Sequence, residues 1–196
     1  MLTEDQIDDV MFDARGGELE NIETFFKAQD KPLEALKQVK DQYTESTPLH
    51  YAAANGHIDV VKYLLGLVGE DSEAQAAFIS AQNDSGNTAL HWAALNGNLD
   101  IVKLLCEAKA DPFIKNESGQ DVLYSAENFD KEEVIDYLLE NYDYAPKEDD
   151  ENIKIRYEDE SAEGDAEAEE TEEAKEEAAG DKETEEVTET LKTTSV

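Results

Sequence analysis

Between residues 83 and 113, the apolar positions follow a pattern that predicts two short helices joined by a tight turn. Thr88 can cap the first helix with its side-chain oxygen, and Gly97 supplies the backbone angles that the turn requires. A unit of this kind cannot bury its apolar stripe alone, so neighbouring copies must cover it. The stripe on the second helix consists of Leu99, Ile101, Val102, Leu104 and Leu105.

Further copies of this unit flank it on both sides. Residues 43–66 repeat the pattern and contain the sequence Thr-Pro-Leu-His at the start of the first helix. Residues 116–142 follow at an offset of 33 positions, although polar residues replace several consensus ones, as a terminal cap requires. Residues 3–27 carry a fainter copy that begins with a possible capping box. The period and the Thr-Pro-Leu-His sequence resemble ankyrin repeats, so we expect an all-α solenoid of about four repeats over residues 1–142, with degenerate terminal caps.

Two connections are longer than ankyrin repeats need. Residues 28–42 contain apolar residues at a spacing of three and predict a short helix that begins near Pro32. About eight extra residues around 69–81 predict another short helix, capped by Ser72 and carrying Phe78. Insertions in solenoids often form loops on one face, but these segments could equally lengthen the second helices. The sequence leaves both readings open.

Negative charge dominates the chain, whose formal net charge is −34. Residues 143–196 carry 22 acidic and 6 basic side chains, and the first 142 residues carry 28 and 10. Because 143–196 holds few aliphatic residues, we expect a largely disordered acidic tail, in which only 152–157 could dock locally or add a strand. The charge disfavours direct binding to nucleic acid or to an anionic membrane, and no apolar run reaches the length of a membrane span. A basic protein is therefore the expected partner.

Candidate groups for chemistry are few and have structural explanations. His50 and His91 occupy the histidine position of the repeat, and His57 stands at the turn after Gly56. Cys106 is the single cysteine and lies on an apolar stripe, which favours a small buried side chain in a reducing compartment. Phosphate-binding and calcium-binding loop patterns are absent from the sequence. We expect no catalytic residue, no metal and no cofactor, and hence no enzyme.

The remaining candidate site is a protein-binding concave groove, formed by the turn tips and the outward sides of the first helices. Tyr51, Trp92 and Phe129 would place aromatic rings beside carboxylates, which suits lysine and arginine side chains of a partner helix. Alternatively, Tyr51 and Trp92 only fill space in the stack. The predicted groove residues are Tyr51, Ala54, Asn55, Asp84, Ser85, Asn87, Trp92, Leu95, Asn96, Glu117, Ser118, Asp121, Glu127, Asn128 and Phe129, with Tyr43, Thr44, Ser46, Gln120 and Ser125 beside them.

Several segments go beyond the general ankyrin pattern: 52–57, 87–97, 100–106, 110–114 and 131–134. These segments and the long connector closely resemble the fungal Yar-type ankyrin-repeat proteins. The tail resembles theirs in composition only. The resemblance implies that this chain is a dedicated chaperone of the small-subunit KH-domain ribosomal protein S-three. The resemblance implies that the chain binds newly made S-three one to one, keeps it soluble and escorts it to preribosomes in ribosome biogenesis.

The resemblance also implies a protein of the cytoplasm and nucleus that is a monomer apart from its client. The start of the chain lacks the basic residues of a signal peptide, and a Lys/Arg-rich import signal is also lacking, so nuclear entry would rely on the client. Two alternatives stay open: an ankyrin adaptor or inhibitor that regulates an enzyme complex, and an acidic histone-type chaperone.

Overall fold

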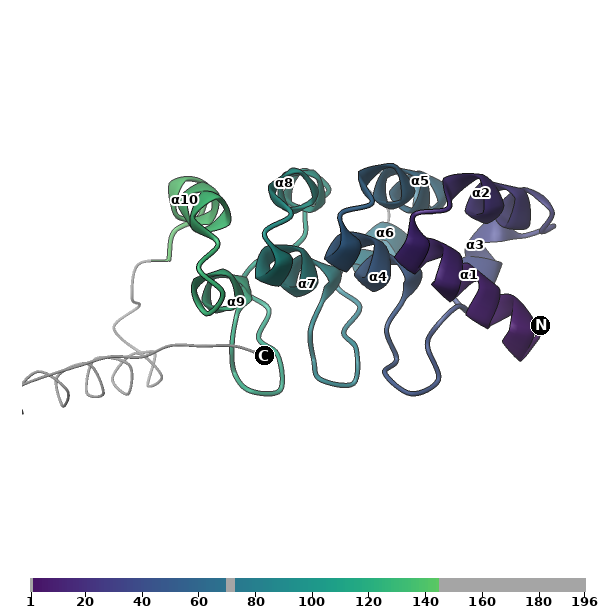
Figure 1. Cartoon of the computed structure of the whole chain (residues 1–196), viewed down its shortest axis with the longest axis horizontal. Helices are drawn as coiled ribbons and strands as arrows, with labels where there is room; N and C mark the ends of the chain where they lie inside the picture. Colours follow the sequence, from purple (N-terminus) through teal and green to yellow (C-terminus); the bar gives the residue numbers. More distant parts are fainter. Residues whose placement is uncertain (1, 70–72, 145–196) are drawn as a thin grey trace, which may run out of the picture. The chain divides into compact units, whose positions relative to one another are not determined.

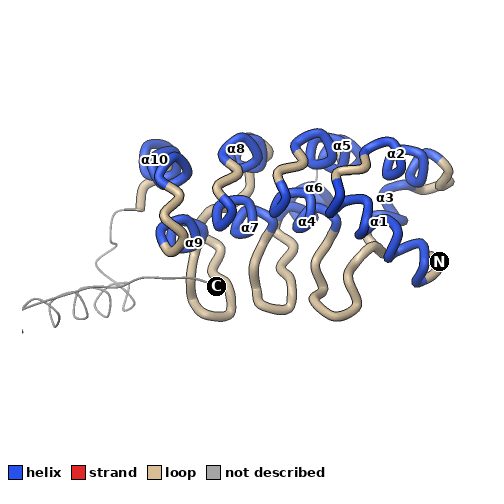
Figure 2. The backbone as a smooth tube through the Cα atoms, viewed as in Figure 1, coloured by secondary structure: helices blue, strands red, loops and turns tan. Residues whose placement is uncertain are grey.

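The computed structural model of the protein describes residues 2–69 and 73–144, in which the chain forms ten α-helices and no β-strand (Figures 1 and 2). The tail predicted from residue 143 lies outside the described residues except for its first two positions, and so do 152–157 and Ser72. The helices are α1 (Glu4–Gly16), α2 (Leu19–Lys27), α3 (Pro32–Leu36), α4 (Pro48–Asn55), α5 (Ile58–Val68), α6 (Glu73–Ile79), α7 (Ala89–Asn96), α8 (Leu99–Glu107), α9 (Val122–Glu127) and α10 (Glu132–Asn141).

Eight of these helices form four helix-turn-helix pairs that stack side by side, as the sequence predicts. The inner helices α1, α4, α7 and α9 form one row, and the outer helices α2, α5, α8 and α10 form a second row (Figure 1). Between repeats the chain extends into three loops, here called fingers, at residues 41–46, 83–87 and 116–120 (Figure 2). The fold is therefore an ankyrin-type solenoid, with one helix layer on top of another and a row of fingers along one side.

The two long connections each add a short helix. α3 begins at Pro32, as predicted, and α6 covers the stretch predicted to carry Phe78. α6 is a separate helix that packs against α5, so the inserted residues do not simply lengthen the outer helix.

The core lies between the helix rows and between successive repeats. Ala52 and Ala53 of α4 are fully buried, as are the equivalent Ala93 and Ala94 of α7. Their small side chains let adjacent inner helices approach closely, and the larger buried residues of each stripe fill the space between the rows. These larger residues include Leu49, Val61, Leu64, Leu90, Ile101, Val102 and Leu105.

One buried histidine in each central repeat ties an inner helix to the next finger. The Nδ1 atom of His50 accepts a hydrogen bond from the Thr47 backbone N–H (3.1 Å), and its Nε2–H donates to the Asn87 carbonyl (2.9 Å). His91 repeats the arrangement and donates to the Gln120 carbonyl (3.3 Å). Burial lowers the pKa of both rings, that of His50 to about 4, so both are neutral at pH 7. The predicted structural role of these histidines is confirmed.

A second periodic contact ties two outer helices, α5 and α8, to the repeat that precedes each of them. His57, just before α5, donates from Nε2 to the Arg15 carbonyl at the end of α1 (2.8 Å). Asn98, at the same position before α8, donates to the carbonyls of Ala53 and Ala54 (2.8 and 3.0 Å). His57 therefore has a structural role in the turn, as expected.

The turn beside His57 requires glycine for two reasons. Gly17 has a φ of +78°, in the left-handed region. A Cβ atom at this position would also lie 2.5 Å from Nδ1 of His57. Any side chain here would displace the histidine that joins the first two repeats.

Side-chain caps set the shape of each finger, and backbone hydrogen bonds join neighbouring fingers. The Oδ1 atom of Asn83 accepts hydrogen bonds from the backbone N–H groups of Ser85 (3.1 Å) and Asn87 (2.9 Å). The side chains of Asp41 and Asn116 likewise accept backbone N–H hydrogen bonds in the other two fingers. The Asp84 N–H donates to the Thr44 carbonyl (2.9 Å), and the Glu117 N–H donates to the Ser85 carbonyl (3.1 Å). The fingers thus form one connected edge of the solenoid.

We predict that the stabilising effect of His50 depends on pH. The unfolded histidine titrates near 6.5, whereas burial lowers the pKa in the folded protein to about 4. Between these values the unfolded chain binds more protons, so folding stability is lost as the pH falls from 6.5 towards 4. The difference in unfolding free energy between wild type and His50→Asn, measured with urea, should be largest at pH 7 and about 1–2 kcal/mol smaller at pH 5. Titration of the acidic surface is common to both proteins and cancels. A difference that stays constant with pH would show that His50 is not held neutral.

Candidate protein-binding face

Aromatic side chains occupy equivalent positions on three adjacent inner helices. Each stands five residues before the turn glycine that ends its helix: Phe12 in α1, Tyr51 in α4 and Trp92 in α7. We call these three residues the aromatic row. Phe12 is 73% exposed, and the other two are half-buried. The row ends at the fourth repeat, where the equivalent residue is the buried Ser125.

Tyr51 connects the aromatic row to the first finger and to α1. Its hydroxyl donates to Oδ2 of Asp41 (3.0 Å), and the Arg15 guanidinium lies over its ring, 4.3 Å from the centroid. Burial alone would raise the pKa of the Asp41 carboxyl, but backbone N–H groups of Thr44 and Tyr43 donate to it and hold that pKa below its usual value. A positive charge, an aromatic ring and a carboxylate therefore meet where the inner helices join the fingers.

Trp92 differs from Tyr51 in the surroundings of its polar atom. Its indole Nε1–H is buried, and no hydrogen-bond acceptor within the described residues faces it. An unpaired buried donor costs free energy, so packing of the ring must offset that cost. Trp92 is half-buried, with its Nε1 atom covered and another part of its ring open to solvent.

The finger tips carry most of the exposed polar positions that the sequence predicts. Asp84, Ser85, Glu117 and Ser118 are all exposed, and Tyr43, on the first finger, is 82% exposed. Because hydrogen bonds join the fingers, the carboxylates of the second and third fingers stand on one edge, beside the aromatic row.

Two predicted groove residues near the fingers are structural parts of the fold. Asn87 is half-buried; its carbonyl accepts from His50, and its side-chain Oδ1 accepts from Asn116 (2.9 Å). Asp121 caps α9 by accepting the Tyr124 N–H (2.9 Å). Both side chains shape the site more than they present groups to a partner.

The ends of the inner helices supply the remaining predicted positions. Asn55 and Asn96 are exposed, and each amide donates to the carbonyl four residues earlier in its own helix (2.8 Å). Ala54, Leu95 and Glu127 are half-buried, and Asn128 and Phe129 are exposed.

The sequence-based description of this face was wrong for two serines and missed two residues of α1. Ser46 and Ser125 are 3% and 8% exposed, and the Ser125 hydroxyl donates to the Asp121 carbonyl (3.1 Å). Phe12 and Arg15 were overlooked because the first repeat lacks the Thr-Pro-Leu-His sequence. Aligning Gly17 with the turn glycines of the next repeats would have placed both correctly.

The described residues offer little for chemistry of other kinds. Within residues 2–69 and 73–144, histidine, cysteine, aspartate and glutamate side chains form no group of three or more placed to hold a metal ion. Over the same residues, every helix is too short or too polar to cross a bilayer. Cys106 is half-buried, and burial raises the pKa of its thiol, which therefore stays protonated at neutral pH.

Comparison with known proteins agrees with this architecture. The family profile described as ankyrin repeats (3 copies) matches residues 10–116 and 75–152. The chain belongs to the ankyrin-repeat family. The ankyrin repeat-containing protein YAR1 of Saccharomyces cerevisiae is 49% identical to it over 154 residues, which cover 77% of this chain and 76% of the relative.

A solved structure resembles this ankyrin-repeat chain along most of its length. The crystal structure of the yeast ribosomal protein Rps3 in complex with its chaperone Yar1 contains a matching chain with a TM-score of 0.71 and 46% sequence identity. The match covers 75% of this chain and 99% of that chain.

Proposed function

We propose that this protein is a dedicated chaperone of the ribosomal protein S-three, the Rps3 of yeast. It binds newly made S-three one to one, keeps it soluble and escorts it to preribosomes during ribosome biogenesis, in the cytoplasm and nucleus. The observation that carries the proposal is the 49% identity, over three quarters of the chain, to yeast YAR1, together with the match to the structure of Rps3 with its chaperone. The function is stoichiometric binding and needs no catalytic residue.

Electrostatics gives a physical reason for such a pairing. A ribosomal protein that has not yet met its RNA exposes basic surface, which binds other polyanions or promotes aggregation. The first 142 residues of this chain carry 28 acidic against 10 basic side chains, and residues 143–196 add a further 22 acidic ones. Carboxylates of the chaperone thus replace the missing phosphates until the RNA is available.

The inner-helix face is the surface that suits a segment of the client best. The aromatic row supplies large, partly exposed rings, and the finger tips supply Asp84 and Glu117 along one edge. A client helix that lies along the row would bury an apolar face against the rings and direct lysine or arginine side chains towards the carboxylates.

We predict that charge reversal at the finger tips weakens client binding selectively. Asp84→Lys combined with Glu117→Lys should lower the affinity for purified S-three by about tenfold, because it turns an attractive edge into a repulsive one. The control is Glu107→Lys with Glu140→Lys, which makes the same change in net charge at exposed positions on outer helices. Affinities measured by calorimetry should stay within about threefold of wild type for the control, and should fall with added salt for all three proteins. Equal losses for the two double variants would mean that only net charge matters and that the finger assignment is wrong.

We predict that removing an exposed ring of the aromatic row weakens client binding. Phe12→Ala should lower the affinity for S-three by about fivefold or more, which corresponds to at least 1 kcal/mol, with little change in thermal stability because the ring is mostly exposed. Leu139→Ala is the matched control, since Leu139 is an exposed apolar residue of the outer helix α10. Trp92→Ala should also weaken binding, but its effect must be corrected for loss of stack stability. An unchanged affinity in Phe12→Ala would remove α1 from the binding face.

A further inference from the structure

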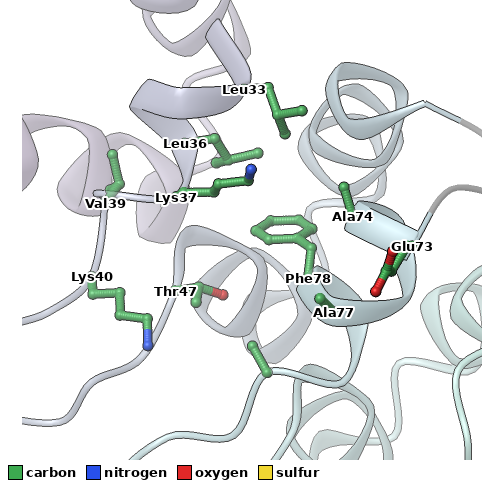
Figure 3. Close-up of a pocket in the computed structure, with 11 residues that line it drawn as sticks. Leu33, Leu36, Lys37, Val39, Lys40, Thr47, Glu73, Ala74, Ala77 and Phe78 are labelled. Atoms are coloured by element: carbon green, nitrogen blue, oxygen red, sulfur yellow. The ribbon is translucent and has the colours of Figure 1, made fainter.

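The two short helices that the ankyrin pattern does not require lie on either side of an apolar groove. α3 packs on α2 and α5, and α6 packs on α5. The space between α3 and α6 has a volume of about 480 Å³ and is open to solvent (Figure 3). We call it the insertion groove. Its volume falls within the range of known ligand pockets.

Apolar side chains line the insertion groove, and some of them are at least partly exposed. Leu36 and Val39 line it and are fully buried, whereas Leu33 and Phe78 are half-buried and Ala77 is exposed. In Figure 3 the Phe78 ring stands between the side chains of α3 and the backbone of α6. Both walls come from the connections that exceed the repeat, so the solenoid itself does not account for this surface.

The charged side chains that line the insertion groove are two lysines and one glutamate. Lys37 and Lys40 lie on the α3 side, and Glu73 lies on the α6 side (Figure 3). Lys37 pairs with Glu34 (3.0 Å), but both side chains are more than half exposed, so the pair contributes little. Lys40 has no carboxylate within ion-pair distance among the described residues. The groove therefore offers an apolar strip beside an unpaired ammonium group.

We propose that the insertion groove binds a short amphipathic helix of a second partner protein, distinct from the basic client. The helix presents apolar side chains to Phe78 and Ala77 and a carboxylate to Lys40, so apolar burial supplies affinity and the charge pair fixes the orientation. On the α3 side a cationic side chain would meet the unpaired Lys40, which disfavours it there, whereas the finger edge attracts it. The chaperone can then hold a basic protein on its inner face and an acidic motif at this groove at the same time.

A differential peptide selection tests this proposal with the full-length protein. A phage library of random dodecapeptides is first depleted on Ala77→Glu, which places a carboxylate in the groove wall, and then enriched on wild type. The enriched peptides should combine several large apolar residues with at least one carboxylate. Their affinity should fall about tenfold in Ala77→Glu and in Lys40→Glu.

The neighbouring Ala76 supplies the matched control. Ala76 is exposed in the same helix but does not line the groove, so Ala76→Glu should leave peptide affinity within about twofold of wild type. Circular dichroism and S-three affinity should be unchanged in all three variants, which separates a lost site from a lost fold. Lys40→Glu lies outside α6 and keeps the test valid if Ala77→Glu disturbs that helix.

Three results would overturn the proposal. The first is a selection in which no peptide distinguishes wild type from Ala77→Glu. The second is enrichment of basic peptides, or of peptides that Ala76→Glu weakens equally. The third is that no peptide is enriched, while sodium laurate shifts the NMR amide signals of α3 and α6. That result would assign the groove to an aliphatic carboxylate and not to a protein partner.

Discussion

Each repeat of this protein buries its apolar surface against its neighbours, and the rest of the structure depends on that burial. Fully buried alanines bring the inner helices together, and the buried imidazoles of His50 and His91 extend the connection to the next finger. A neutral ring serves this purpose well, because it accepts one backbone hydrogen bond and donates another without bringing a charge into the core. Stability is therefore shared along the stack, and the fingers that carry the binding groups inherit their positions from it.

The rigid stack allows a strongly acidic surface to be used for recognition. Like charges on a flexible chain would push it into extended conformations, whereas here the helix pairs fix where the carboxylates stand. Hydrogen bonds between fingers hold Asp84 and Glu117 on one edge, and Tyr51 with Asp41 connects that edge to the aromatic row. Complementarity to a basic partner thus comes from placement as well as from net charge. The insertion groove, with Lys40 on its α3 side, is the separate surface that we propose for an acidic motif.

Much of the fold follows from local sequence. Apolar spacing and turn glycines predict the four helix pairs, Pro32 predicts the start of α3, and the Thr-Pro-Leu-His sequence predicts the role of His50. These features depend on residues within one or two turns of each other, or on a strict period, and both can be read from a single chain.

The details of the surface depend on contacts that local sequence does not encode. Ser46 is polar and next to a finger tip, yet the folding of the finger base buries it. The insertion groove requires two segments about forty residues apart in the sequence to pack on the same helix, α5. Such features depend on how the repeats pack together, so the spacing of residues in the sequence does not predict them.

The central claim is that this acidic solenoid exists to hold one basic ribosomal protein. Native mass spectrometry of the full-length protein, isolated at low salt from the cells that make it, tests the claim most directly. The predicted result is an equimolar complex with S-three that dissociates as salt is raised. Isolation of the protein alone, with histones or with an enzyme complex would contradict it.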